Sequence, residues 1–505
     1  MKNTFITGIK KKTNFDYTEN GALTHKTTMS DLYDLFALGG AYRTRSDADC
    51  ITLFKKAYKE NPEYALKCLF YLRDILEGQG ERRFFRVCLK WLAGYDTAAV
   101  VRNLKSVPNY ARWDDLYCLV GTKAESAAFD VIKEQLMLDM TCKTPSLLAK
   151  WLKSENTSSL ESRKLAKITR EHLDMTPRQY RKTLSVLRGK INVLERLMSA
   201  GKWDEIEFDK IPSKAGLIYR NAFARHDVER CKADPQITSY EDFIKDENTK
   251  VNAKALYPYE VVEKAINLVG NEYYFTREED LVPLDNLDRL TINKYWDNLD
   301  DYFDGTCLNA LPVVDTSGSM WGNPINIAIS LGLYCAMHNR GPFEDHYISF
   351  SSRPQLIRTE GVDFCDKVKR IYQTNLCDNT NIEATFDLIL NTVLENNMSQ
   401  EDIPENLLII SDMEFDSAQG WHHNKVDKTL MESIAEEWEE AGYHMPHLVF
   451  WNVNARNDRI PMEDKDGITF VSGASPITYQ MIMTGKSSID LMFDKLNSDR
   501  YSIIQ

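Results

Sequence analysis

The chain has 505 residues, 43% of them hydrophobic and 27% charged, which is typical of globular proteins and allows two or three domains. No apolar run approaches the roughly 20 residues that a membrane-spanning helix needs. The N-terminus also lacks the apolar stretch of a secretory signal. These features argue against a membrane-spanning or secreted protein, and a cytoplasmic location is expected.

The charge is divided unevenly along the chain. The formal net charge is −13 for the whole protein, but residues 301–505 carry −17 and the first 300 residues carry +4. The acidic excess therefore belongs to the C-terminal part. The N-terminal part can still present a basic surface to a partner.

Residues 1–29 read as a flexible basic leader, and residues 30–300 read almost wholly as helices. The stretch 62–76 has apolar residues at helical spacing, with Pro62 at its start and Gly78 just past its end. The stretch 185–199 repeats the apolar pattern. Many helices with short connections predict a helical bundle or a HEAT-like solenoid, although no fixed-period repeat is visible.

Residues 301–505 alternate short apolar strands with helices. The expected strands are 308–314, 346–350, 354–358, 406–411, 447–453 and 467–471. The expected helices are 324–338, 363–373, 381–395 and 428–441. This alternation predicts an α/β domain with a mainly parallel, doubly wound sheet that has helices on both faces.

Oxygen-bearing side chains follow the ends of the expected strands. Asp315, Ser317 and Ser319 follow the first strand, Asp412 follows a later one, and Thr380 precedes a helix. Ligands bind at the carboxyl ends of strands in such sheets. Hydroxyl and carboxylate oxygens suit a hard cation such as Mg²⁺ or Mn²⁺.

Other interpretations of these residues fit the sequence less well. Asp and Ser are common in ordinary turns, and Thr380 or Asp412 alone fits a helix N-cap. An aspartic protease needs two D-T-G motifs, a haloacid dehalogenase-type phosphatase needs D-x-D, and a serine hydrolase needs a nucleophile elbow. The sequence contains none of these around Asp315, so the combination favours a metal site.

The D-x-S-x-S sequence, the later Thr and the later Asp resemble the metal-ion-dependent adhesion site of the von Willebrand factor A domain. The resemblance covers roughly residues 305–485. It implies a Rossmann-like α/β domain in which Asp315, Ser317, Ser319, Thr380 and Asp412 hold Mg²⁺ or Mn²⁺. It also implies an open metal position for an acidic group from a protein partner, or for a phosphate.

A helical half followed by such a domain resembles the TROVE family, typified by the Ro autoantigen. That resemblance implies helical repeats that close into a ring and bind small structured or single-stranded RNAs. The stretches 71–86, 110–121 and 216–227 look closer to a family of related proteins from cells and viruses. RNA binding is thus an expectation from the family plan, without residues carried over from it.

The helical half also has basic stretches of its own. Residues 143–199 carry a net charge of +8, and further arginines follow the sequence G-Q-G at 78–80. Ordinary solvated helix faces would explain the same residues. The candidate RNA contacts are Arg82, Arg83, Arg86, Arg163, Lys164, Lys167, Arg170, Arg178, Arg181, Lys182, Arg188 and Lys190.

The sequence therefore predicts a non-enzymatic protein that binds RNA through its helical half and an acidic partner or a phosphate through a Mg²⁺-dependent site. The alternative is a metal-dependent scaffold for protein contacts without nucleic acid. A metal-dependent hydrolase has the least support, because no general base stands beside the metal pattern. Glu414 and Asp416 lie near Asp412 but are expected in so acidic a domain.

Overall fold

The computed structural model describes residues 10–11, 13–269, 282–303, 305, 308–351, 353–374, 381–416, 429–463 and 467–505. The chain divides into two compact units. The α/β unit contains Met1–Pro62 and Ala253–Lys495, and the helical unit contains Glu63–Asn252 and Leu496–Gln505. This division differs from the predicted domains 30–300 and 301–505, because residues from both ends of the range 30–300 pack with elements of the α/β unit.

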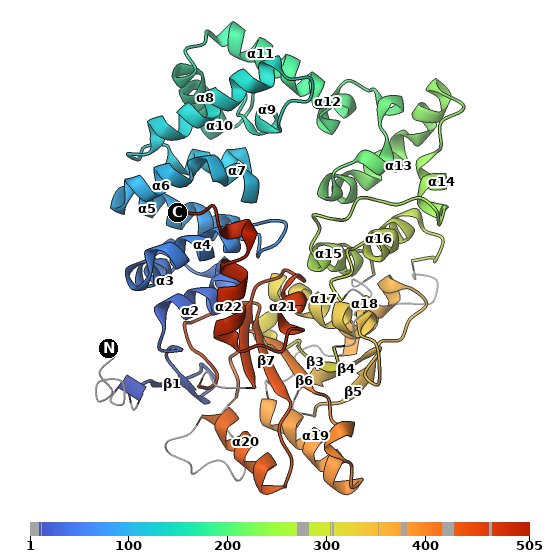
Figure 1. Cartoon of the computed structure of the whole chain (residues 1–505). Coiled ribbons are helices and arrows are strands. Elements are labelled where there is room, and N and C mark those ends of the chain that lie inside the picture. The colour runs from blue at the N-terminus through green and yellow to red at the C-terminus, as the bar shows by residue number, and fades with distance from the viewer. Residues whose placement is uncertain are drawn as a thin grey trace. The chain divides into compact units, whose positions relative to one another are not determined.

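The α/β unit is built on a six-stranded sheet with the order β5-β4-β3-β6-β7-β8 (Figure 1). All neighbouring strands are parallel except β4 and β5, which pair antiparallel. Each predicted strand is confirmed, with end shifts of at most two residues. The strands are β3 (Ala310–Asp315), β4 (His346–Phe350), β5 (Leu356–Arg358), β6 (Asn406–Ser411), β7 (His447–Asn452) and β8 (Ile468–Ser472).

The helices of this unit include the four that were predicted after residue 301. The longer ones are α2 (Asp31–Leu38), α3 (Asp47–Glu60), α15 (Pro258–Val269), α16 (Leu287–Asp297), α17 (Asn323–His338), α18 (Phe364–Thr374), α19 (Ile382–Glu395), α20 (Leu430–Glu440), α21 (Thr478–Ile482) and α22 (Ser488–Leu496). The 3-10 segments are η1 (Gly39–Thr44), η8 (Gly318–Met320) and η9 (Gln400–Asp402).

The helices cover both faces of the sheet. The connection through α17 and the connection through α20 step away from the sheet centre in opposite directions, so right-handed crossovers place them on opposite faces. In Figure 1, α17 and α18 lie on one side of the strands and α19 and α20 on the other. All six residues of β3 are buried, as expected for a central parallel strand.

One glycine allows close packing between α17 and the central strand. A Cβ added to Gly332 would lie 2.3 Å from Cγ2 of Val314, closer than real Cβ contacts. A side chain at position 332 would therefore push α17 away from β3. The helix fixes β3, and with it the position of Asp315 at the end of the strand.

Residues 13–29 do not behave as the flexible leader that the sequence suggested. They contain an antiparallel hairpin of β1 (Phe15–Tyr17) and β2 (Leu23–His25). Bridges from Gly21 to Asp416 and from His25 to Ile460 join the hairpin to loops after β6 and β7. The N-terminal segment is thus part of the α/β unit at the carboxyl edge of its sheet.

The helical unit confirms the helical half that the sequence predicted, and its helices pack mainly on near neighbours in the chain, such as α5 on α6 and α8 on α10. Its α-helices are α4 (Pro62–Arg73), α5 (Arg82–Tyr95), α6 (Thr97–Asn103), α7 (Val107–Tyr110), α8 (Glu125–Thr141), α9 (Leu148–Trp151), α10 (Leu160–His172), α11 (Pro177–Lys190), α12 (Leu194–Ser199), α13 (Ser213–Ala233) and α14 (Tyr240–Lys245). Its 3-10 segments are η2 (Leu104–Ser106), η3 (Trp113–Leu119), η4 (Trp203–Glu205), η5 (Phe208–Lys210) and η11 (Asp499–Tyr501).

The single helix predicted at 185–199 is wrong. The chain leaves α11 after Lys190 and re-enters a helix only at Leu194, with Asn192 at a positive φ of 47°. Asn tolerates this left-handed conformation better than most residues, which allows the break.

The last ten residues of the chain pack on the first helices of the helical unit. The Tyr501 hydroxyl donates to Asp74 Oδ2 at 2.9 Å, and its ring stacks on Tyr110 with centroids 5.6 Å apart.

Among all described residues, no helix is both long and apolar enough to cross a membrane.

Candidate functional site

The two central strands of the sheet lead into acidic residues. β3 ends at Asp315, and Asp412 directly follows β6. Val314 lies beside Ile410 in the parallel register, so both acids leave the sheet at the same edge. Strand order changes direction between β3 and β6, and open α/β sheets bind ligands at such a point. Asp315 and Asp412 are only 0% and 1% exposed.

Asp315 is held by hydrogen bonds from the end of β6 and from the turn that follows β3. Its Oδ2 accepts from Ser411 Oγ at 2.6 Å, and its Oδ1 accepts from the amide of Ser317 at 2.9 Å. Burial, and after it the negative charge of Asp412, raises the pKa of Asp315 to about 7. Two buried carboxylates this close need a compensating positive charge to ionise together.

Asp412 has one oxygen without a partner. Its Oδ1 accepts from the Glu414 amide at 3.2 Å, whereas its buried Oδ2 makes no hydrogen bond of good geometry within the described chain, although the Ser319 hydroxyl lies beside the carboxylate. Burial raises the pKa of Asp412, and the Ser319 hydroxyl beside it acts in the opposite direction. A buried acceptor left unpaired costs about 1–3 kcal/mol. Asp412 Oδ2 is therefore an acceptor that a bound cation or another donor would satisfy.

The two serines complete the described part of the predicted set. Ser317 Oγ and Ser319 Oγ lie 3.0 Å apart, because the 3-10 turn η8 folds the chain back after Ser317. Met320 is fully buried and anchors this turn. Asp315, Ser317, Ser319 and Asp412 thus lie together. The fifth predicted residue, Thr380, lies outside the described residues.

The donor set fits a hard divalent cation. It offers two carboxylates and two hydroxyls, the oxygen ligands that Mg²⁺ and Mn²⁺ prefer. The described residues contain no group of three or more His, Cys, Asp and Glu able to hold a metal. A cation here would therefore depend on the serine hydroxyls and on water as well as on Asp315 and Asp412.

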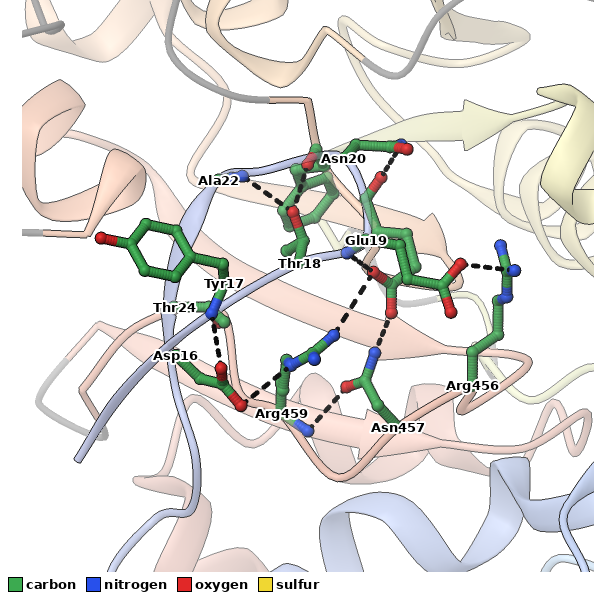
Figure 2. Close-up of polar contacts among 12 residues, drawn as sticks. Asp16, Tyr17, Thr18, Glu19, Asn20, Ala22, Thr24, Arg456, Asn457 and Arg459 are labelled. Carbon is green, nitrogen blue, oxygen red and sulfur yellow. Dashed lines mark hydrogen bonds and ion pairs between the residues drawn. The ribbon is translucent and has the colours of Figure 1, made fainter.

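The sequence did not reveal the role of Ser411 or of the N-terminal hairpin. Figure 2 shows hairpin residues turned toward the loops that follow β6 and β7. Thr18 Oγ1 donates to the Phe415 carbonyl at 2.7 Å, and the Glu19 amide donates to Glu414 Oε2 at 2.6 Å. Arg456 Nη2 pairs with Glu19 Oε2 at 2.5 Å. The hairpin therefore braces the loop that carries Asp412.

The carboxylate of Glu414 is buried and hydrogen-bonded to other parts of the α/β unit rather than exposed to solvent. It is 1% exposed, and its carboxylate accepts from the Glu19 amide and from Asn457 Nδ2 (Figure 2). Burial raises the pKa of Glu414. The sequence could not separate this bracing role from a surface acid, because Glu19 lies 395 residues and Asn457 lies 43 residues away from Glu414 in the chain.

An exposed aromatic side chain lies beside the candidate site. Trp321 follows the serine turn directly and is 66% exposed, whereas most large aromatic residues of this unit are buried. The only sequence signal for it was its position two residues after Ser319. Exposed tryptophans are common anchors in protein interfaces.

The basic candidates of the helical unit fall into two groups. Arg170 and Arg181 pair with Glu155, Arg188 donates to the Ala149 and Leu152 carbonyls, and Lys190 donates to the Cys142 carbonyl. Arg86 pairs with Asp115, and Lys167 lies 3.9 Å from Glu171. Within the described chain, the exposed candidates that have no partner are Arg82, Arg163, Lys164, Arg178 and Lys182; Arg83 is also exposed.

Comparisons with known proteins give two family matches. The family described as "Domain of unknown function (DUF2828)" matches residues 18–116 and 135–300, slightly more than half of the chain. The family described as "Domain of unknown function (DUF7788)" matches residues 309–500, which include the whole sheet.

Proteins similar to the chain include one from a virus and one from a bacterium. "Uncharacterized protein L728" of Acanthamoeba polyphaga mimivirus is 29% identical over 514 residues, covering 94% of this chain and 85% of that protein. The crystal structure of the Deinococcus radiodurans RO (RSR) protein matches with a TM-score of 0.39 and 14% identity, covering 91% of this chain and 100% of that one. A TM-score this low carries no argument about fold or function. By the extent of the first family match, the chain belongs to the family described as Domain of unknown function (DUF2828).

Proposed function

We propose that this protein is a non-enzymatic binding protein whose α/β unit recognises a partner through a bound Mg²⁺ or Mn²⁺. The unpaired, buried Asp412 Oδ2 beside Asp315 is the observation that carries the proposal. Asp315, Asp412, Ser317 and Ser319 would hold the cation. Thr380 joins them if the resemblance to a von Willebrand factor A adhesion site extends to the ligands.

The chemistry of such a site is attraction of an acidic group. Two carboxylates and two serine hydroxyls would supply fewer oxygens than the six that Mg²⁺ prefers, so the cation would keep an open position for another oxygen ligand. An acidic side chain of a partner protein supplies such an oxygen, and a phosphate would do so too. Exposed Trp321 would add an apolar contact at the edge of the site.

A binding role is proposed rather than catalysis because of how Glu414 is used. Glu414 is the buried acid nearest to Asp412 in sequence, and the hairpin and Asn457 already occupy its carboxylate. A general base must be able to take a proton from a substrate or water. Panels of phosphatase, nuclease and protease substrates with Mn²⁺ should therefore show no turnover.

The first experiment uses the metal alone. Titration calorimetry with Mn²⁺ should show one site in the wild-type protein, and Asp412→Asn should weaken binding at least about tenfold, since it removes one of two charged ligands. Asp130→Asn, which changes an exposed acid without a described partner, should bind Mn²⁺ like the wild type. Equal Mn²⁺ binding by all three proteins would contradict the proposal.

The helical unit supports a second function, RNA binding, which the resemblance to the TROVE plan also implies. The specific observation is the group of unpaired, exposed cations on α10 and α11: Arg163, Lys164, Arg178 and Lys182. Cations that no carboxylate neutralises are free to contact phosphates. The alternative is a metal-dependent scaffold in which these helix faces are only solvated.

Salt-dependent RNA binding separates the two alternatives. If RNA binds, replacing these four residues by Gln should weaken binding. The slope of log K against log salt should fall by roughly 0.7 for each phosphate that the variant no longer neutralises. An absence of RNA binding at low salt by the wild-type protein would favour the scaffold.

A further inference from the structure

Five cations gather around two carboxylates in the helical unit. Arg73 donates to Asp115 Oδ2 through Nε at 3.1 Å and Nη2 at 2.7 Å, and Arg86 Nε donates to Asp115 Oδ1. Arg73 and Asp115 are 1% and 0% exposed. This buried pair forms the base of the cluster.

Three cations surround the second carboxylate, Asp114, and each of them is more accessible to solvent than Arg73. Arg86 Nη2 lies 3.1 Å from Asp114 Oδ2, Arg112 Nε lies 3.2 Å from Oδ1, and Lys153 Nζ lies 3.8 Å from Oδ2. The side chains of these three cations are 31%, 21% and 29% exposed. They therefore stand between the buried pair and solvent.

The fifth cation, Arg82, makes no direct ion pair within the described chain, although the charges of Asp115 and Asp114 act on it. The residue is exposed, yet protein atoms crowd its guanidinium and lower its pKa, and the charge of Arg73 lowers it further. Burial, together with the charges of Arg82 and Arg73, lowers the pKa of Arg112 to about 10. Both arginines stay protonated at neutral pH, so the cluster has three positive charges more than negative ones.

Some donors in the cluster are also unused. Arg86 Nη2 and Arg112 Nε are buried and make no hydrogen bond of good geometry, although Asp114 lies within ion-pair distance of both. The guanidinium of Arg112 lies 4.0 Å from the ring centroid of Trp151, which fixes its plane. Oriented guanidinium groups with spare donors match the several oxygens of a phosphate.

We infer that Arg82, Arg86, Arg112 and Lys153 form a phosphate-binding site that takes a backbone phosphate of single-stranded RNA. The site rests on the RNA binding proposed for the helical unit and gives that function a location. A carboxylate ligand would use fewer donors and less charge than the cluster offers. The aromatic and guanidinium planes at Trp151 and Arg112 suit an unstacked base next to the phosphate.

Arg82→Gln tests the site, because Arg82 supports no described contact and its replacement should not alter folding. A matched control is Arg102→Gln, which changes an exposed arginine of α6 that also has no described partner. The probe is a fluorescent single-stranded oligouridine, followed by anisotropy at several salt concentrations. Lys153→Gln serves as an independent second variant, and thermal unfolding checks that every variant is folded.

We expect Arg82→Gln and Lys153→Gln each to weaken oligouridine binding at least about fivefold and to reduce the salt slope by roughly 0.7. Arg102→Gln should bind like the wild type. Inorganic tripolyphosphate should compete with the RNA in the wild type and should no longer compete in Arg82→Gln.

The other outcomes are distinct. If the wild type binds oligouridine but both site variants bind it equally well, this site is wrong and RNA binding elsewhere on the unit stands. If the wild type binds neither oligouridine nor tripolyphosphate, the proposed RNA function fails together with the site. If tripolyphosphate binds through Arg82 but RNA does not bind, the assignment of the ligand to RNA is overturned.

Discussion

Ser411 Oγ lies 2.6 Å from Asp315 Oδ2 and donates a hydrogen bond to it, although 96 residues separate the two in the chain. The bond joins the ends of the two central strands, and Ser411 Oγ in turn accepts from the amide of Met413 at 3.0 Å. Ser411 therefore orients Asp315 and at the same time shapes the loop that carries Asp412.

Ser411→Ala should destabilise the protein and weaken metal binding. The change leaves Asp315 Oδ2 buried without its donor, so the free energy of unfolding should fall by about 1–3 kcal/mol. Urea denaturation in EDTA measures this decrease, and Mn²⁺ titration measures the weaker affinity. Ser185→Ala, which changes an exposed hydroxyl of α11 without a described partner, is the control. A Ser411→Ala protein with wild-type stability and affinity would show that Ser411 does not position the site.

Glu432 should make the α/β unit sensitive to acid. Burial raises the pKa of Glu432, but hydrogen bonds from His25 and Thr429 outweigh burial and lower the pKa to about 2. A carboxyl with a lowered folded-state pKa stabilises the protein above its unfolded value of about 4.5. That contribution disappears as the pH falls toward 2.

Glu432→Gln should therefore lose less stability than the wild type between about pH 4.5 and pH 2, by an amount on the order of 3 kcal/mol. The measurement is the difference in unfolding free energy between the two proteins across this range. His25 Nε2 lies 3.4 Å from Glu432 Oε1, so the same experiment tests whether the hairpin is docked in solution. Parallel stability curves for the two proteins would show that neither His25 nor Thr429 lowers the pKa of Glu432 in solution, which would contradict the docked hairpin.

Asp115→Asn should strongly destabilise the helical unit. The change leaves Arg73 buried opposite a neutral side chain, and breaking a buried ion pair in this way costs about 3–5 kcal/mol. Asp174→Asn, which breaks an exposed pair with Lys133, should leave the urea midpoint nearly unchanged. If the two variants lose the same stability, the ion pair between Arg73 and Asp115 does not stabilise the helical unit as a buried pair should.

Much of the α/β sheet could be predicted from the sequence because parallel strands are buried on both faces. Their apolar runs are continuous, and each ends abruptly in polar residues, as at Asp315 and after Ser411. The meeting of Asp315 and Asp412 followed from the same rule, since carboxyl ends of neighbouring parallel strands share an edge.

The remaining features depend on contacts distant in sequence. The hairpin strands have three residues each and are held by loops near residues 415 and 460, so no local pattern signals them. The break near Asn192 interrupts an apolar pattern that would also suit one helix. In the sequence, the arginine cluster was recognisable only as a set of basic residues. Ion pairing and burial in the folded protein decide which of these cations stay unpaired.

The most direct test of the proposed metal site is the anomalous scattering of Mn²⁺ in crystals of the wild-type protein. We predict one strong anomalous peak at the carboxyl edge of the sheet, in contact with Asp412 Oδ2 and beside Ser317 and Ser319, and no such peak in Asp412→Asn crystals. Wild-type crystals in saturating Mn²⁺ that show no anomalous density between Asp315 and Asp412 would contradict the metal site.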